Sequence, residues 1–351
     1  MAINMERIVE IAREMHCSDI HLSVGLPPTF RIAGSLQQAP FSLTDAETEN
    51  LINTMMTETQ RRQLEQGFDQ DFAFASAQNS RQRVNVYRQQ GKLATAIRLL
   101  NLHIPRLEEL GLPPILQTLA EEPRGLILVT GPTGSGKSTT LAAMIENINC
   151  KRAEHILTIE DPIEYIYEQK MAIIHQREVG RDVQSFAAAL RSALREDPDV
   201  ILVGEMRDFE TISAAVTAAE TGHLVLSTLH TSGAAQTIDR IIDACPASTQ
   251  GQIRIQLSTI LRGVVTQQLI PLADGSGRIV ASEILIGTDA VGNMIRENKC
   301  HQLDSQMQAG AASGMHTLNG DLVRLLSAKK ITKENALKFA SNKRDLQQYL
   351  N

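Results

Sequence analysis

The chain of 351 residues contains no tryptophan, and its aromatic residues make up only 3% of the total. Stacked aromatic side chains are the usual platform for single-stranded nucleic acid, so this scarcity argues against such a surface. Positive charge is not in excess either, because 34 Lys and Arg stand against 40 Asp and Glu, which gives a net charge of −6. Nucleic-acid binding depends on clustered positive charge, and we therefore expect no nucleic-acid partner.

Long apolar runs and paired cysteines are also missing. No run reaches the roughly 18 apolar residues that a membrane-spanning helix needs, and the charged residues near the N-terminus argue against a secretory signal. The four cysteines are scattered without a C-x-x-C pair: Cys17, Cys150, Cys245 and Cys300. This spacing favours reduced thiols over disulfides or a zinc site. We expect a cytoplasmic protein with no transmembrane segment.

The most specific pattern in the sequence is a phosphate-binding loop. Gly131, Gly136, Lys137 and Ser138 occupy every fixed position of the motif G-x-x-x-x-G-K-[ST]. Apolar residues predict a buried strand before the loop and, at helical spacing, a helix after it. Backbone N–H groups of the loop and the start of that helix would then face the phosphates of a nucleotide. A glycine-rich turn without a ligand is the alternative, and four fixed positions in this setting disfavour it.

The predicted nucleotide-binding residues are contiguous: Gly131, Pro132, Thr133, Gly134, Ser135, Gly136, Lys137, Ser138 and Thr139. Lys137 is expected to reach the β- and γ-phosphates of ATP. The Ser138 hydroxyl is expected to bind Mg²⁺.

Polar residues follow three further predicted strands, near 155–160, 200–205 and 224–229. In a parallel sheet, ligands bind beyond the carboxyl ends of the strands, so these polar residues should converge near the γ-phosphate. Hydrolysis of ATP needs a carboxylate that orients or deprotonates water, an acceptor in the metal shell and a γ-phosphate sensor. The candidates are Glu164 and Glu205 for the two carboxylates, with Glu205 bound to the metal directly or through water, and His230 for the sensor. A satisfied core histidine is the structural alternative for His230.

The chain divides into regions of different pattern. Short strand patterns, with a capping box over 44–47, predict a small α+β domain over 1–101. A connector rich in Leu and Pro spans 102–123. Alternating strands and helices over 124–286 predict a parallel sheet with helices on both faces, and a helical region follows over 287–351.

With these motifs placed, the chain resembles the motor ATPases of type II and type IV secretion, and most closely the PilT group of type IV pilus retraction ATPases. The resemblance covers nearly the whole length. The phosphate loop matches the Walker A motif, and 158–164 matches the Asp box. Residues 194–205 match the atypical Walker B motif, with Gly204 where most phosphate-loop proteins have Asp. Residues 221–230 match the His box.

This resemblance implies a PAS-like N-terminal domain followed by a RecA-like ATPase core and a C-terminal helical region. It implies that Glu164 is the catalytic base and Glu205 the metal-associated acid. In the family, arginines of the N-terminal domain reach the nucleotide of a neighbouring subunit, and Arg83 and Arg98 occupy the matching places. Arg81 shares a strand face with Arg83 and is a further candidate. An exposed strand with solubilising charge is the alternative.

The resemblance also implies a hexameric ring that hydrolyses ATP to ADP and phosphate and powers pilus retraction, which underlies twitching motility. The expected partners are further copies of the chain and a platform protein of the inner membrane. The protein would then lie at the cytoplasmic face of the membrane, at the pilus base. The sequence leaves open whether a paralogous motor ATPase shares the work.

Residues 290–297 resemble the AIRNLIRE motif that the family associates with retraction, but Gly292 stands where the motif has Arg. This departure keeps open an accessory subunit of a mixed motor ring. A pilus-assembly or type II secretion ATPase is another alternative, although those proteins commonly carry an extra N-terminal domain and a four-cysteine zinc module. A nucleic-acid translocase is a third, because the RecA-like core is widely shared, and salt-dependent DNA binding would support it.

Overall fold

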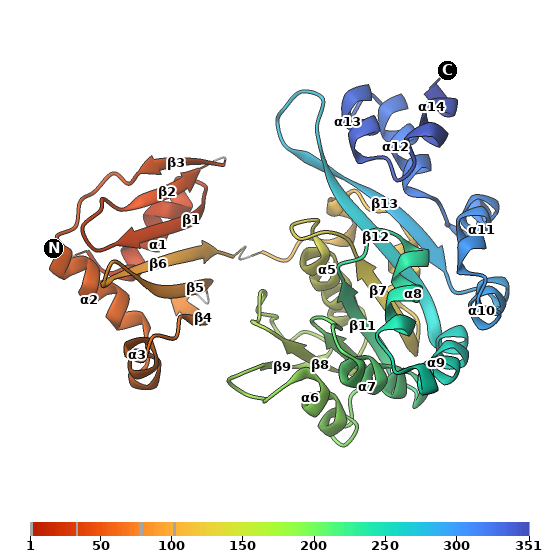
Figure 1. Ribbon diagram of the computed structural model, residues 1–351, viewed down its shortest axis with the longest axis horizontal. Coiled ribbons are helices and arrows are strands. Elements are labelled where there is room, and N and C mark those ends of the chain that lie inside the picture. The colour runs from red at the N-terminus through yellow and green to blue at the C-terminus, as the bar shows by residue number, and fades with distance from the viewer. Residues whose placement is uncertain (1–2, 33, 77–79, 101–102, 351) are drawn as a thin grey trace. The chain divides into compact units, whose positions relative to one another are not determined.

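The computed structural model describes residues 3–32, 34–76, 80–100 and 103–350, apart from the side chains of residues 76, 80, 81, 349 and 350 (Figure 1). The chain forms two compact units. The first comprises Met1–His103 with Pro162–Ile166, and the second comprises Ile104–Asp161 with Tyr167–Asn351. Of the helices in the described ranges, none has the length and apolar character that crossing a membrane requires.

The first unit is an antiparallel sheet with helices packed on one face. Its six strands have the order β3-β2-β1-β6-β5-β4. Their bounds are β1 (Cys17–Ser23), β2 (Thr29–Ile32), β3 (Ser35–Gln38), β4 (Gln70–Ser76), β5 (Ser80–Gln89) and β6 (Lys92–Leu99). The three helices of this unit are α1 (Met5–Glu14), α2 (Asp45–Met55) and α3 (Glu58–Glu65). Ile8, Ile20 and Ile52 belong to the core that these helices share with the sheet.

The second unit is built on a seven-stranded sheet of order β13-β12-β7-β11-β10-β8-β9. Neighbouring strands from β12 to β9 pair in parallel, and β13 pairs antiparallel with β12. The bounds are β7 (Gly125–Thr130), β8 (His155–Glu160), β9 (Ile173–Glu178), β10 (Val200–Val203), β11 (Leu224–Leu229), β12 (Leu261–Pro271) and β13 (Arg278–Ile286). The predicted α/β class with a parallel sheet is therefore confirmed.

Helices cover both faces of this sheet. Leu126 and Leu128 of β7 share one core with α6 (Phe186–Ala193), α7 (Phe209–Glu220), α8 (Ala234–Asp243) and α9 (Ala247–Ile260). Ile127 and Val129 alternate to the opposite face, on which α5 (Lys137–Lys151) contacts β7 and β11. A short helix of the connector, α4 (Ile115–Ala120), packs against α5.

Three local predictions differ from the structure. The sequence pattern does not predict β9, a short edge strand whose central residues are polar. A hairpin predicted over 266–286 is present as β12 and β13, but β12 begins earlier, at Leu261, and also pairs in parallel with β7. The first half of β12 is buried on both faces and shows little alternation, so the pattern does not indicate it. The sequence pattern predicts a helix over 182–196, but α6 is shorter, since Ser185 caps its start by accepting a hydrogen bond from Ala188 N.

The C-terminal helices lie along the β13 side of the sheet (Figure 1). They are α10 (Asp289–Arg296), α11 (Leu303–Ala309), α12 (Leu318–Ser327), α13 (Lys333–Phe339) and α14 (Lys343–Leu350). His316, just before α12, forms an isolated β-bridge with Ile284 of β13. The start of α12 is thereby fixed to the edge of the sheet.

Gly292 sets the distance between α10 and α9. It is buried, and a Cβ atom on this residue would lie 2.6 Å from the backbone oxygen of Ser258 in α9. Real Cβ atoms do not approach an oxygen so closely, so any other residue would push the two helices apart. The arginine that the related motif carries at this position therefore does not fit the present packing.

Replacing Gly292 with Ala is expected to destabilise the fold by about 1–2 kcal/mol. Overpacking costs about 1–3 kcal/mol, and the better helix propensity of Ala offsets only about 1 kcal/mol of it. Gly251→Ala in α9 is the matched control, because a Cβ there meets nothing within 4 Å. It should stabilise the protein by about 0.5–1 kcal/mol. Urea unfolding measures both, and equal effects from the two substitutions would contradict the packing argument.

Candidate active site

The phosphate loop connects the end of β7 to the start of α5. Gly131 has a φ of +138°, and a Cβ atom there would lie 2.3 Å from the backbone oxygen of Gln267 and 2.7 Å from Ser135 Oγ. Gly136, with a φ of +94°, is the N-cap residue of α5 and supplies no side-chain cap. The loop can therefore take this shape only with glycine at Gly131, and the N-cap residue places no side chain between a ligand and the first turn of α5.

The side chains of the loop fit a bound phosphate. The Lys137 ammonium donates to the backbone oxygens of Gly131 and Pro132, at 2.8 and 3.0 Å, so it lies folded over the loop. Ser135 Oγ is buried and has no hydrogen-bond partner among the described residues. Buried polar atoms without partners are costly, and a phosphate oxygen would satisfy this hydroxyl.

Gln267 of β12 supports the phosphate loop by a hydrogen bond, and the sequence pattern did not indicate this residue. Its side chain is 1% exposed. Nε2 donates to Ser135 O at 2.8 Å, and Oε1 accepts from Thr140 Oγ1 in α5 at 2.9 Å. One amide thus connects the loop to the first turn of the helix. A polar residue in an otherwise apolar strand pattern was the available signal, but the partner strands could not be predicted from it.

Glu205 and His230 come together at the ends of neighbouring strands. His230 Nε2 lies 3.5 Å from Glu205 Oε2, and Arg207, also missed by the sequence analysis, lies 2.7 Å from Glu205 Oε1. The parallel register of β10 and β11 causes this proximity, and Thr228 Oγ1 reinforces it by donating to Gly204 O at 2.7 Å. The Glu205 carboxylate is 20% exposed, so it remains accessible from solvent.

Glu164 lies beyond the end of β8, in the segment Pro162–Ile166 that groups with the first unit. Its side chain is half-buried. Glu160, the last residue of β8, is buried and accepts hydrogen bonds from Thr158 Oγ1 and Gln176 Nε2, at 2.7 and 3.2 Å. The Glu160 carboxylate is thus bonded to side chains of β8 and β9.

Arg83 and Arg98 are direct cross-strand partners in β5 and β6, on the face of the first unit opposite its helices. Arg83 makes two hydrogen bonds to the Asp71 carboxylate, at 2.8 and 3.3 Å, and Arg98 Nε donates to Asp19 Oδ1 at 2.9 Å. Burial of Asp19 opposes ionisation, but hydrogen bonds from Ser18 and Arg98 outweigh it and lower the pKa of the Asp19 carboxyl.

Both arginines remain substantially exposed, at 45% and 65%, and could contact an external anion. The side chain of Arg81 lies outside the described part of the chain.

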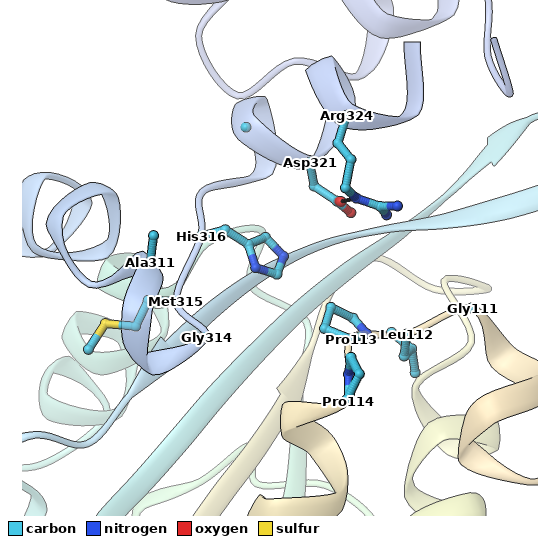
Figure 2. Close-up of a pocket in the computed structure, with 11 residues that line it drawn as sticks. Gly111, Leu112, Pro113, Pro114, Ala311, Gly314, Met315, His316, Asp321 and Arg324 are labelled. Carbon is cyan, nitrogen blue, oxygen red and sulfur yellow. Dashed lines mark hydrogen bonds and ion pairs between the residues drawn. The ribbon is translucent and has the colours of Figure 1, made fainter. Parts of the chain in front are cut away.

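A cavity of about 450 Å³ lies apart from the phosphate loop and shares no lining residue with it (Figure 2). Pro113 and Pro114 line one side, and His316, Asp321 and Arg324 line another. Asp321 Oδ1 accepts from Arg324 Nε at 2.6 Å, and Asp321 Oδ2 accepts from Ser282 N at 2.8 Å. The bond from Ser282 joins α12 to β13.

The family described as Type II/IV secretion system protein matches residues 2–348. The chain is 46% identical to the type IV pilus retraction ATPase PilT of Pseudomonas aeruginosa over 335 residues, covering 95% of this chain and 97% of the relative. It is 39% identical to the type IV pilus ATPase PilU of the same organism, covering 98% and 90%. The fold matches a crystal structure of the pilus retraction motor PilT with bound ADP, with a TM-score of 0.92 and 47% identity, covering 99% of both chains.

Gln267→Leu is expected to weaken ATP binding by about 10- to 100-fold. The substitution keeps the volume but leaves Ser135 O and Thr140 Oγ1 without their buried partner, which costs about 1–3 kcal/mol. Gln268→Leu is the control, because strand alternation turns Gln268 to the other face of β12. Isothermal titration calorimetry with ATP compares the two variants. Equal affinities would contradict a role of Gln267 in shaping the loop.

His316 should make the stability of the fold depend on pH. Burial lowers the pKa of the imidazole below its ordinary value of 6.5. The unfolded chain then binds more protons as the pH falls below about 6.5, so the contribution of His316 is present above that value and lost on acidification. Urea unfolding at pH 7.5 and 5.5 should therefore show a smaller loss of stability for His316→Gln than for the wild type. His301→Gln, at an exposed site, is the control, and its loss of stability should match that of the wild type. An equal loss in all three proteins would refute the effect of His316.

Proposed function

Because the chain belongs to the type II/IV secretion system protein family, we propose that it is an ATPase motor that powers retraction of a type IV pilus. The observation that carries this proposal is a complete phosphate loop beside the Glu205–His230 pair, in a chain that matches a pilus retraction ATPase over nearly its whole length. Hydrolysis converts ATP to ADP and phosphate, and the released free energy drives movement of the ring.

The phosphate loop binds the nucleotide through its backbone N–H groups and through Lys137. In this reaction Lys137 leaves the carbonyls of Gly131 and Pro132 and pairs with the β- and γ-phosphates. Ser138 and Glu205 would hold Mg²⁺, Glu205 directly or through water, and the ion would neutralise phosphate charge when bound. The exposed Ser138 hydroxyl and the accessible Glu205 carboxylate are oxygen donors of the kind that Mg²⁺ prefers.

Two side chains act on the γ-phosphate side. Glu164 is the general base, which orients and deprotonates the attacking water. His230 senses the γ-phosphate, and its contact with Glu205 connects this sensor to the metal-binding acid. When the γ-phosphate leaves, His230 loses a hydrogen-bond acceptor, and the loop that carries it can move.

Arg83 and Arg98 act on the nucleotide of a neighbouring copy. Arginines supplied in trans stabilise the charge of the transition state and can raise rates by about 10³–10⁵-fold. Such contacts run head to tail and close into a ring, which we propose to be a homohexamer. Asp71 and Asp19 orient the guanidinium groups until the nucleotide arrives.

The ring delivers its work to a platform protein of the inner membrane. It therefore lies in the cytoplasm, against the membrane at the pilus base. A paralogous motor ATPase is a further partner that this arrangement accommodates. A second candidate function, an accessory subunit of a mixed ring, is favoured by Gly292, because the arginine of the related motif is replaced by a residue buried against α9.

In cells that lack the gene, pili should extend without retracting until the wild-type gene is restored. Lys137→Ala should fail to rescue, and the purified variant should lose at least about 100-fold in ATPase rate, because a preorganised charge at the phosphates is removed. Lys151→Ala, at the other end of α5, is the matched control and should rescue. Fluorescence microscopy of labelled pili and a phosphate-release assay make these measurements. Absent pili would indicate an assembly motor, and normal pilus dynamics would refute the proposal.

A further inference from the structure

Glu283 of β13 is a buried carboxylate that none of the proposed chemical steps uses. It is 6% exposed. Its Oε1 accepts a hydrogen bond from Ala234 N, the first residue of α8, at 2.7 Å, and its Oε2 accepts from Leu318 N, the first residue of α12, at 3.4 Å. Burial raises the pKa of this carboxyl, and the carboxylate of Asp304 adds to the effect, whereas the two backbone N–H donors oppose it.

The first of these bonds replaces a missing helix cap. The N-cap residue of α8 is Gly233, which has no side chain to accept the free N–H groups of the first turn. Glu283 supplies the acceptor from a different strand. Its negative charge also lies at the positive ends of two helices, and this favourable field compensates part of the cost of burial.

The segment in front of α8 is the His230 loop, residues 230–233, which joins the end of β11 to the start of the helix. Thr231 Oγ1 lies 2.7 Å from Thr237 Oγ1, and Thr237 Oγ1 donates to Gly233 O at 2.7 Å. The loop is therefore attached to the first turns of α8. Because only three residues separate His230 from Ala234, the place of the α8 terminus limits where His230 can lie relative to Glu205.

The second bond of Glu283 leads to the C-terminal helices. One rung further along the β12–β13 ladder, Gln267 pairs with Ser282, whose N–H donates to Asp321 of α12. Gln267 holds the phosphate loop from the same rung. Two adjacent residue pairs of one hairpin thus bond to the phosphate loop, to the start of α8 that follows the His230 loop, and to α12.

We infer that Glu283 is a positioning residue for the ATPase reaction, which fixes the start of α8 behind the His230 loop and ties that loop to α12. The inference rests on the proposed ATPase function. Glu283 itself touches neither the nucleotide nor water in the reaction. A shift of the His230 loop on loss of the γ-phosphate reaches α12 through this carboxylate.

The kinetic test uses Glu283→Ala and Glu283→Gln in the full chain. Misplacement of His230 in the Ala variant should lower kcat by about 10- to 100-fold. KM for ATP should change less than about threefold, since Gln267 still holds the phosphate loop. The Gln variant keeps one acceptor oxygen and should recover part of the rate, and Glu334→Gln, at an exposed site, should behave as wild type. If kcat falls, KM rises and thermal stability falls together, the role of Glu283 is merely structural and the inference is overturned.

Hydrogen exchange with and without ADP separates this inference from the proposed function. In the wild type, ADP should change the exchange of amides over 131–140 and over 318–322 together. In Glu283→Ala the first change should persist and the second should be lost. An unchanged response over 318–322 would overturn the inference. If the wild type binds ADP but hydrolyses no ATP, the proposed function fails. The exchange experiment then still shows whether Glu283 couples residues 131–140 to residues 318–322. If the Ala variant does not fold, the same readout on Glu283→Gln decides.

Discussion

The close approach of β12 to the phosphate loop is the contact on which the site depends. Backbone from Gln267 lies so near Gly131 that no Cβ fits between them, and the Gln267 amide bonds both to the loop and to α5. Such a contact requires β12 to pair with β7 in parallel at a fixed register. The shape of the nucleotide site therefore depends on the register between β7 and β12. A shift of that register by one residue would remove the contact of Gln267 with the loop.

The same sheet order explains why the acidic and basic groups meet. Glu205 and His230 are separated by a helix in the chain, yet they leave adjacent parallel strands at the same edge. The short polar contacts of Ser227 and Thr228 with the end of β10 keep the two strand ends level. The meeting of Glu205 and His230 thus follows from the pairing of their strands.

Local patterns in the sequence were sufficient for part of this architecture. The phosphate loop is contiguous and its motif is strict, so it could be placed before any fold was known. Strand alternation placed Arg81 and Arg83 on one face, and the family resemblance alone indicated Arg98. In the structure Arg83 and Arg98 are cross-strand partners. Gln267 and Glu283 could not be predicted in the same way, because their partners lie more than thirty residues away in the chain. Likewise β9 is short and polar at its centre, and its place at the edge follows from pairing with β8 alone.

The ion pairs of the first unit give the exposed arginines a resting place. Arg83 with Asp71 is a solvent-facing pair, and such pairs are worth only about 0–1 kcal/mol. Asp19, the partner of Arg98, is only 15% exposed, so the second pair is more shielded from water. The Arg83 guanidinium is thus held in a defined direction by an interaction of about the size of thermal energy. Under the proposed function, Arg83 would exchange the Asp71 carboxylate for a phosphate at little cost. An arginine held this weakly would bind a negatively charged group without straining the subunit that carries it.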